Sequence, residues 1–588
     1  MGRLRTAVVV VSSVGICAGL VHATDSVSSA TAPSTSATIG QSSSGGSGGE
    51  DRSSSKEEEG VSIPPDRLDW HLPDPQGHRV SVEAQLHDAE RAGDRASIES
   101  ITRVLKRVGA IHRPRQMSLS LQDALHRALK NSFAIAVASY NPAVETTRVV
   151  EAEAAFDALF FANVIKNIQD QPPESQLVTA HRDSFSLESG VRKLLPVGTQ
   201  VSASFALTRS KTSSRFATQF GQVNPQYTSN IILEMRQPLL RGFGIDQNRS
   251  LIVIADNDRQ VSELAFRRQV RDTLRKVEVS YWNLVQARRD VVVAARLLAG
   301  FETIYAYLEA RKDFDVIPVQ LAATKADLER SHADFVRSCA NVFDAEDTLI
   351  AAINAADIDL ADDTEIVPTD FPILDRIVVD RLAEAQTALD NRPEIKESEL
   401  AVANARVAAV RAKNAELPKF DLTFRYTIDG LAGTADKAFD EVSRHKYTEY
   451  FVGVELEIPI GNRGPRAVHH RARLQHLQAI AALKAKFEEV ILDVNLAVRK
   501  LGSTFDEIGP LYESVEASER EVSSIVARAE RMDINTLRNE LNARQNLAAV
   551  RRSLLGTVVD YNVAIIELER ATGTLLQHYN IAIAPAAD

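Results

Sequence analysis

The chain contains the same order of elements twice, and this duplication constrains its fold more than any other feature. An alternating stretch that ends in Pro238 recurs as one that ends in Pro459, and a turn rich in Gly, Arg and Asn follows each. From Pro238 to Ala322 in the first copy, and from Pro459 to Ala543 in the second, the separation is 84 positions. Two copies in one register are equivalent structural units, so we expect function to lie in how they assemble.

Residues 1–23 have the pattern of a secretory signal peptide. Arg3 and Arg5 precede an apolar run, and Ala23 ends the short segment where cleavage is expected. The alternative is that Cys17 is a lipid-attachment site, but a bulky isoleucine precedes it where such sites favour a small residue. We therefore expect an exported chain.

Composition narrows the class of protein. Cys339 is the only cysteine left after the signal, so no intrachain disulfide is expected. No uninterrupted run of about 20 apolar residues follows the signal, so we expect no membrane-spanning helix. The net charge of −11 argues against a nucleic-acid partner.

The sequence shows no arrangement typical of catalysis or of metal binding. His469 and His476 are two helical turns apart, with no cysteine or suitably spaced acid beside them, so a solvated helix face explains them better than a metal site. No nucleophile, phosphate loop or isolated acid pair is present. We expect a protein that is not an enzyme and holds no metal or cofactor.

The chain divides into a leader, two copies and short flanking segments. Residues 24–62 are dominated by Ser, Thr and Gly, which is typical of a disordered tether. Ser120 can cap an opening helix that reaches about Ala155, and Pro393 lies just inside the corresponding helix of the second copy. The remaining boundaries are an N-terminal pre-domain segment at 63–116, a first repeat at 117–360, a connector at 361–390, a second repeat at 391–577 and a C-terminal tail at 578–588.

Each copy contains strands with one apolar and one polar face. A partner strand at 452–458 follows the clearest of these, and the first copy offers candidates at 156–165, 200–208 and 231–237. The clearest strand alternates polar residues with five large apolar ones: Phe420, Leu422, Phe424, Tyr426 and Ile428.

The first copy is longer in its strand region. Arg148 and Arg406 are 258 positions apart before the strands, whereas Pro238 and Pro459 are 221 apart after them, so the first copy has 37 additional residues. We interpret the polar stretch around 210–229 as an external loop that contains them.

Each strand region leads into a very long amphipathic helix. The first runs from about 248 to 311, and at 1.5 Å per residue these 64 positions span roughly 95 Å. The second runs from 466 to about 531. Hairpins near 313–318 and 533–536 return the chain through helices of about 40 residues. The first long helix has apolar residues in steps of four and three: Val270, Leu274, Val277, Tyr281 and Leu284.

Strands of about ten residues with one apolar face match a tilted crossing of a lipid bilayer. In a generic protein such strands belong to the half-buried sheet of a soluble sandwich, but export favours the membrane interpretation here. Four strands cannot close a barrel, because an open edge in lipid leaves backbone groups unpaired. Closure therefore requires several chains.

The sequence resembles the TolC family of outer-membrane efflux proteins over roughly residues 117–577. No single motif decides this, but their order and duplication make the match specific. The motifs are Leu119-Ser120-Leu121-Gln122-Asp123-Ala124-Leu125, Gln237-Pro238-Leu239-Leu240-Arg241-Gly242-Phe243-Gly244, Glu457-Ile458-Pro459-Ile460-Gly461-Asn462-Arg463-Gly464, Tyr561-Asn562-Val563-Ala564 and Arg570-Ala571-Thr572-Gly573.

The resemblance implies a mixed α and β fold that is mainly α, with a long periplasmic α-helical coiled-coil barrel. Each chain would give four strands to a trimeric transmembrane β-barrel in the outer membrane, with the alternating apolar residues facing lipid. The expected partners are two further copies of the chain, a periplasmic adaptor and an inner-membrane transporter. The implied function is the passive channel of a tripartite efflux or type I secretion system.

The resemblance also assigns residues, with two departures. The positions of the family's aperture aspartates hold Asn539 and Asn542, and a ring of amides lacks the negative field that selects cations; an ordinary solvated helix face explains them equally well. The hairpin tips lack the family's glycine. The adaptor-facing tips are Lys312, Asp313, Phe314, Asp315, Met532, Asp533 and Ile534.

The rival function is a periplasmic coiled-coil scaffold or stalk. The strand from Phe420 to Ile428 discriminates, since a scaffold has no need of five large apolar residues on one strand face. Drugs, metals, polypeptides and glycans all stay open as cargo, as do proton-driven and ATP-driven pumps.

Overall fold

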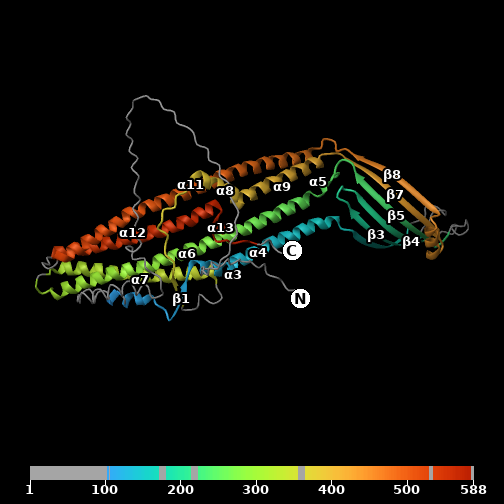
Figure 1. Ribbon diagram of the computed structural model, residues 1–588. Coiled ribbons are helices and arrows are strands. Elements are labelled where there is room, and N and C mark those ends of the chain that lie inside the picture. The colour runs from blue at the N-terminus through green and yellow to red at the C-terminus, as the bar shows by residue number, and fades with distance from the viewer. Residues whose placement is uncertain are drawn as a thin grey trace, which may run out of the picture.

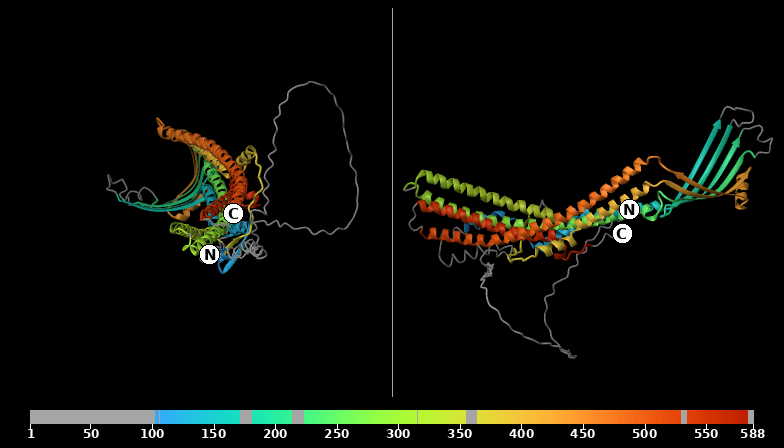
Figure 2. Two further views of the ribbon diagram at one scale, coloured as in Figure 1. Left: turned by 90° about the vertical axis from the view of Figure 1, so that its left-hand side faces the viewer. Right: turned by 90° about the horizontal axis from the view of Figure 1, so that it is seen from above.

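The computed structural model describes residues 102–104, 106–170, 181–212, 223–314, 316–354, 364–528 and 534–583. The predicted signal peptide, with Cys17, the tether at 24–62 and most of the pre-domain segment lie outside these residues, as do Asp315, Met532 and Asp533. The described part is mainly helical with one large sheet at its end, as predicted, and it is strongly elongated (Figure 1). Seen end-on, the helices and the sheet form one curved layer (Figure 2).

Among the described residues, a short strand and two helices follow the helical segment that ends with η2. Ser120 caps the first helix, because its side chain accepts a hydrogen bond of 3.1 Å from the Asp123 N–H. The prediction of one helix to about Ala155 is wrong, since Ser132 adopts an extended conformation and ends the first helix. The elements are η2 (Gly109–Ile111), β1 (Arg115–Leu119), α3 (Leu121–Asn131), α4 (Phe133–Glu153) and η3 (Ala154–Phe156).

Long helices form the body. As predicted, Pro393 is the first residue of its helix, where a missing N–H costs nothing. Pro510 lies inside the 66-residue helix that leads away from the sheet in the second half of the chain. The helices are α5 (Ile245–Asn248), α6 (Ser250–Ala310), α7 (Pro318–Ile353), α8 (Arg381–Asn391), α9 (Pro393–Ala415), α11 (Arg463–Arg528), α12 (Ile534–Thr572) and α13 (Leu575–His578).

The predicted apolar stripe of α6 is buried. Val270, Leu274, Val277, Tyr281 and Leu284 are each no more than 1% exposed. They belong to a core in which α6 packs with α3, α4 and α7, while a second core joins α11, α12 and the start of α9. The long helices are therefore held along their length by neighbours.

Helix α6 is also the one described helix that is long and apolar enough to cross a membrane. Its most apolar 18-residue stretch has a mean hydropathy of 1.5, although no uninterrupted apolar run exists there. Inside the structure 56% of that stretch is buried, as in the core helix of a packed body. Its composition thus reflects burial against α7 and α12.

The sheet at the end of the molecule has six strands, not the predicted four. They are antiparallel in the order β2-β3-β4-β5-β7-β8. The helix α10 (Ala435–Ser443) connects the last two strands. The strands are β2 (Leu159–Asp170), β3 (His181–Leu194), β4 (Gln200–Thr212), β5 (Gln226–Pro238), β7 (Lys419–Ala432) and β8 (Tyr447–Glu457).

The interpretation of the 37 additional residues as an external loop is likewise wrong. Four strands precede α6, whereas two precede α11, so the excess forms an additional β-hairpin, β3 and β4, inside the sheet. The predicted loop at 210–229 overlaps the ends of β4 and β5, which pair directly at Ser210 and Gln226, and its residues 213–222 lie outside the described part of the chain.

A small sheet lies against the middle of the helical body. Strand β1 pairs in parallel with β6 (Thr364–Pro368), which is fully buried. Beside it, the Arg288 guanidinium on α6 binds Glu346 on α7, at 3.2 Å, and Glu365 on β6. Burial raises the pKa of Glu346 to about 7. His112 and Arg288 outweigh burial at Glu365 and lower its pKa to about 2.

Candidate functional site

The six-stranded sheet has two chemically different faces. The register places the five predicted residues Phe420 to Ile428 on one face, because they pair with other apolar residues across β5 and β8. The same face continues on the other strands with Phe160, Val164, Ile168, Phe185, Leu187, Val191, Val201, Phe205, Leu207, Ile231, Leu233, Met235, Val452, Val454 and Leu456. We call it the outward face.

The opposite face, which we call the inward face, carries ion pairs. Arg236 on β5 binds Asp421 on β7 with an Nη2–Oδ2 distance of 2.6 Å. Arg425 on β7 binds Glu234 on β5 at 2.8 Å, and Lys419 contacts Glu455 on β8. Charged groups joined across strands on one face, with apolar groups on the other, are what a wall between water and lipid requires.

Helix α10 covers part of the outward face, a feature that the sequence did not predict. Its Ala438 and Val442 are at most 1% exposed, and they pack over Gly430 on β7. The Phe439 ring lies 6.0 Å from the Phe205 ring on β4. Ile428 is consequently only 6% exposed, so the predicted lipid-facing row ends beneath a helix.

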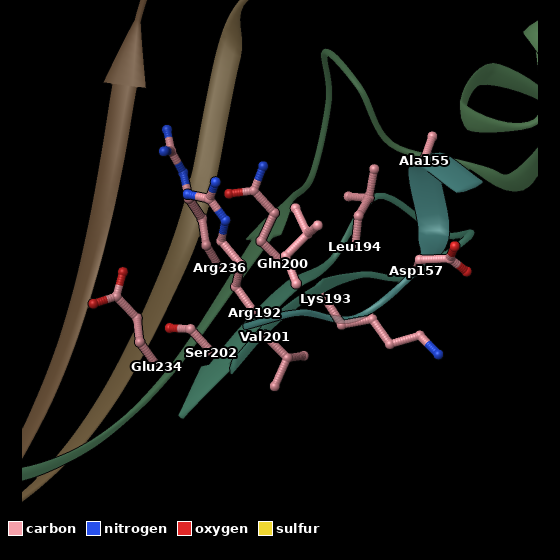
Figure 3. A pocket seen from close by; sticks show the side chains of 11 residues that line it. Ala155, Asp157, Arg192, Lys193, Leu194, Gln200, Val201, Ser202, Glu234 and Arg236 are labelled. Carbon is pink, nitrogen blue, oxygen red and sulfur yellow. The ribbon is translucent and has the colours of Figure 1, made fainter. Parts of the chain in front are cut away.

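A hollow of about 310 Å³ lies where the inward face meets the helices. Arg192, Gln200 and Arg236 extend from β3, β4 and β5 in the same direction beside it (Figure 3). Ser202 and Glu234 continue the lining toward the middle of the sheet. The hollow is therefore polar and adjoins the strands of the additional hairpin.

The predicted aperture residues lie on α12. Asn539 and Asn542 are both exposed in the single chain. Between them Leu541 is buried against α6, where Phe301 and Ile304 lie, and Glu540 binds Arg544. This packing turns both amides away from the helical core.

The predicted hairpin tips lie at the end of the body farthest from the sheet (Figure 1). Lys312, Asp313 and Phe314 form the turn between α6 and α7, and Phe314 is 87% exposed. Ile534 begins α12, where the second hairpin resumes. The structure thus separates the tips and the sheet by the whole length of the helices.

The predicted motif that contains Tyr561 and Asn562 holds the connector before α8 in place. The Tyr561 hydroxyl donates to the Asp375 carbonyl at 2.7 Å, and the Asn562 side chain accepts from the Ile373 N–H at 2.8 Å and donates to the Ile373 carbonyl at 3.2 Å. Both side chains are at most 3% exposed. They fix the connector before α8 along the buried face of α12.

The described residues contain no group of three or more His, Cys, Asp or Glu side chains that could hold a metal ion. His469, considered as a ligand in the sequence, instead contacts the Glu416 carboxylate at 3.0 Å. The described site is thus a sheet with one apolar and one charged face, beside a polar hollow.

Comparison with known proteins confirms the resemblance found in the sequence. Residues 385–574 match the family described as outer membrane efflux protein. No curated protein matches the chain.

Solved structures share the fold at low sequence identity. The CmeC outer membrane channel of Campylobacter jejuni is 14% identical with a TM-score of 0.57, over 77% of this chain and 85% of that chain. The open state of the MtrE outer membrane channel of Neisseria gonorrhoeae is 17% identical with a TM-score of 0.54, over 77% and 88%. The outer membrane protein VceC of Vibrio cholerae is 14% identical with a TM-score of 0.56, over 77% and 96%.

Proposed function

We propose that this chain, of which residues 385–574 match the family described as outer membrane efflux protein, is the outer-membrane channel of a tripartite efflux or type I secretion system. In this proposal three copies form a passive conduit that an inner-membrane pump supplies with substrate. The observation that carries it is the two-faced sheet joined end to end with helices of 61 and 66 residues.

The sheet supports insertion into lipid. Its strands have 11 to 14 residues, which is enough for a tilted crossing of about 9–11 residues. Exposed apolar residues on the outward face, such as Phe160 at 73% and Val452 at 67%, would be costly in water over so wide a surface. The inward face has the charges that a water-filled passage tolerates.

The helical body supports a conduit across the periplasm. Helices of 61 and 66 residues measure roughly 90–100 Å at 1.5 Å per residue, far more than one domain requires. We assign the exposed turn Lys312-Asp313-Phe314, with Asp315, Met532, Asp533 and Ile534, to adaptor docking. We assign Asn539 and Asn542 to the lining of the periplasmic aperture.

Cell fractionation followed by size measurement tests the proposal. The full chain should sediment with the outer membrane, require detergent for extraction, and have a detergent-corrected mass of three chains by light scattering. A chain that is released by lysis without detergent, and that is a monomer, would support the rival scaffold function instead.

A further inference from the structure

We propose that the wall contributed by each chain has six strands, so that three copies close a barrel of eighteen strands whose lumen is wider than a four-strand contribution allows. This inference rests on the proposed function of a three-chain channel. The partner that completes each sheet is a second copy of this chain, at the free edges of β2 and β8.

The additional strands continue both faces of the sheet through their middle parts, although Asp183 and Lys193 place charges on the outward face near the two ends of β3. On β3 the outward face holds Phe185, Leu187 and Val191, while Arg182, Glu188 and Arg192 face inward. A hairpin that stayed in water outside the wall would have no reason to continue the outward apolar face. Strands β3 and β4 therefore both belong to the lipid-crossing wall.

The turn between β3 and β4 is fixed at the level where the other strands meet the helices. Gly198 has a φ of 99°, and a Cβ there would lie 2.4 Å from the Gly242 carbonyl oxygen, so only glycine fits. The Gly244 N–H donates to the Val197 carbonyl at 3.1 Å. The Thr199 hydroxyl, buried, contacts the Gln237 side chain. This anchoring aligns the additional hairpin with the base of the sheet.

The two free edges suit each other in direction. Because an even number of antiparallel strands separates them, β2 runs away from the helices and β8 runs toward them. Copies arranged around a ring would then meet in antiparallel pairs, and no open edge would stay in lipid.

The edges also suit each other in chemistry. On β2 the inward face mixes amides with large apolar groups, and Ile165, six positions from the base of the strand at Leu159, is 60% exposed. On β8 the inward residue Phe451, also six positions from the base of its strand at Glu457, is 44% exposed. Large apolar groups are misplaced beside a watery lumen unless neighbours cover them, and at the boundary between two copies they would cover one another.

The wider sheet has a consequence at its base. Four strands of each chain connect to helices, whereas the β3–β4 turn has no helix below it, and the polar hollow lined by Arg192 and Arg236 lies there. Since barrel diameter grows roughly linearly with strand number, eighteen strands give a diameter about one and a half times that of twelve. The passage through the outer membrane would thus admit solutes that a twelve-stranded barrel excludes.

Electron cryo-microscopy of the full chain in lipid nanodiscs tests the strand count. We expect a ring of three chains with eighteen strands and β8 paired to β2 of the next copy. A trimer with twelve strands and a hairpin outside the ring, or a dimer with twelve strands, would overturn the inference while leaving an outer-membrane channel intact. A monomer without a membrane wall would overturn the proposed function as well.

A deletion variant tests the width. Residues 171–226, which include β3 and β4, are replaced by the two-residue turn Asn-Gly. Strand β2 then pairs directly with β5, with Asp170 opposite Tyr227 and Leu159 opposite Pro238, and each side chain keeps its face. The control deletes residues 214–221 between β4 and β5 and keeps all six strands. The measurement uses planar bilayers, with neutral polymers added at the barrel side. The largest polymer that enters the channel should be larger for the full chain and the control than for the deletion variant. Equal cut-off sizes in all three would contradict a wider lumen.

Discussion

Arg236 on β5 donates two hydrogen bonds to the same oxygen of Asp421 on β7, from Nε at 3.0 Å and from Nη2 at 2.6 Å. The pair joins the last strand before α6 to the first strand after α9, on the inward face. The Asp421 side chain is 7% exposed, so this ion pair replaces much of the hydration that the carboxylate lacks.

Replacing Arg236 should therefore weaken the sheet at the boundary between the two halves of the chain. We expect Arg236→Gln to destabilise the folded protein by about 1–3 kcal/mol, because a nearly buried carboxylate loses its donors. The measurement is the temperature at which the assembly dissociates in detergent. Arg425→Gln is the matched control, since its pair with Glu234 is 44% and 32% exposed and should cost under about 1 kcal/mol. Equal losses from both variants would contradict a special role for the buried pair.

Asn562 should control the attachment of the connector. Asn562→Ala leaves the Ile373 N–H and carbonyl without side-chain partners, so we expect a loss of about 1–3 kcal/mol. The check is limited trypsin digestion, in which cleavage after the exposed Arg376 should become several-fold faster. Asn542→Ala, at an exposed position of the same helix, should leave the cleavage rate unchanged. A cleavage rate in Asn562→Ala equal to that of the unmodified protein would contradict the role of Asn562 in holding the connector.

Glu278 should make stability depend on pH. Burial and the nearby Glu569 raise the pKa of Glu278 from 4.5 to about 8, and its side chain is 1% exposed. A carboxyl whose pKa is raised on folding contributes stability below its unfolded pKa, and this contribution is lost as the pH rises from about 4.5 through 8.

We therefore expect Glu278→Gln to melt about 5 °C higher than the unmodified protein at pH 8.5, with the difference vanishing near pH 4.5. Differential scanning calorimetry across this range gives the profile. Glu309→Gln, at an exposed position on the same helix, serves as the control and should show no such trend. A lower melting temperature for Glu278→Gln than for the unmodified protein at pH 8.5 would contradict the prediction.

The aperture assignment leads to a prediction of selectivity. Amide side chains at 539 and 542 lack the negative field of carboxylates, so the unmodified channel should have weak cation selectivity. We expect the double variant Asn539→Asp, Asn542→Asp to increase the potassium-to-chloride permeability ratio several-fold and to introduce block by multivalent cations. Reversal potentials in planar bilayers measure both. Strong cation selectivity in the unmodified protein that Asn539→Ala or Asn542→Ala abolishes would refute the predicted weak selectivity, and an unchanged permeability ratio in the double variant would refute the assignment.

Local patterns predicted the long elements well. The stripe from Val270 to Leu284 identified α6 because its side chains repeat at helical spacing and become buried on one side. Likewise, the alternation from Phe420 to Ile428 identified β7 and the residues of its outward face. Strong periodicity over many residues leaves little room for another structure.

Within the additional hairpin, the sequence predicts β4 but not β3, because the periodicity of β3 is weak. On the outward face of β3, Asp183, Ser189 and Lys193 interrupt three apolar residues, so the strand depends on its pairing with β2 and β4 rather than on its own pattern. The break between α3 and α4 at Ser132 also carried no proline or glycine signal. Both features depend on tertiary contacts.

The buried charges could not be found from local sequence either. Arg288 is 58 positions from Glu346 and 77 positions from Glu365 in the sequence. Only the packing of β6 against α6 and α7 brings the three side chains together. Similarly, only the fold brings Phe439 on α10 beside Phe205 on a strand distant in the sequence.

Disulfide formation between the sheet edges tests most directly whether identical copies complete one wall. In a Cys339→Ala background, one cysteine is placed on an outward position of β8 and one on an outward position of β2, and whole cells are oxidised. The positions to combine are Val452, Val454, Leu456, Phe160, Ala162 and Val164.

Within one chain these strands are the opposite ends of the sheet, so a disulfide can form only between copies. At least one combination should give covalent dimers and trimers in the outer-membrane fraction, whereas Val454→Cys with Ala203→Cys on the interior strand β4 should give monomers. Monomers from every edge combination, or equal linking in the interior control, would contradict the account.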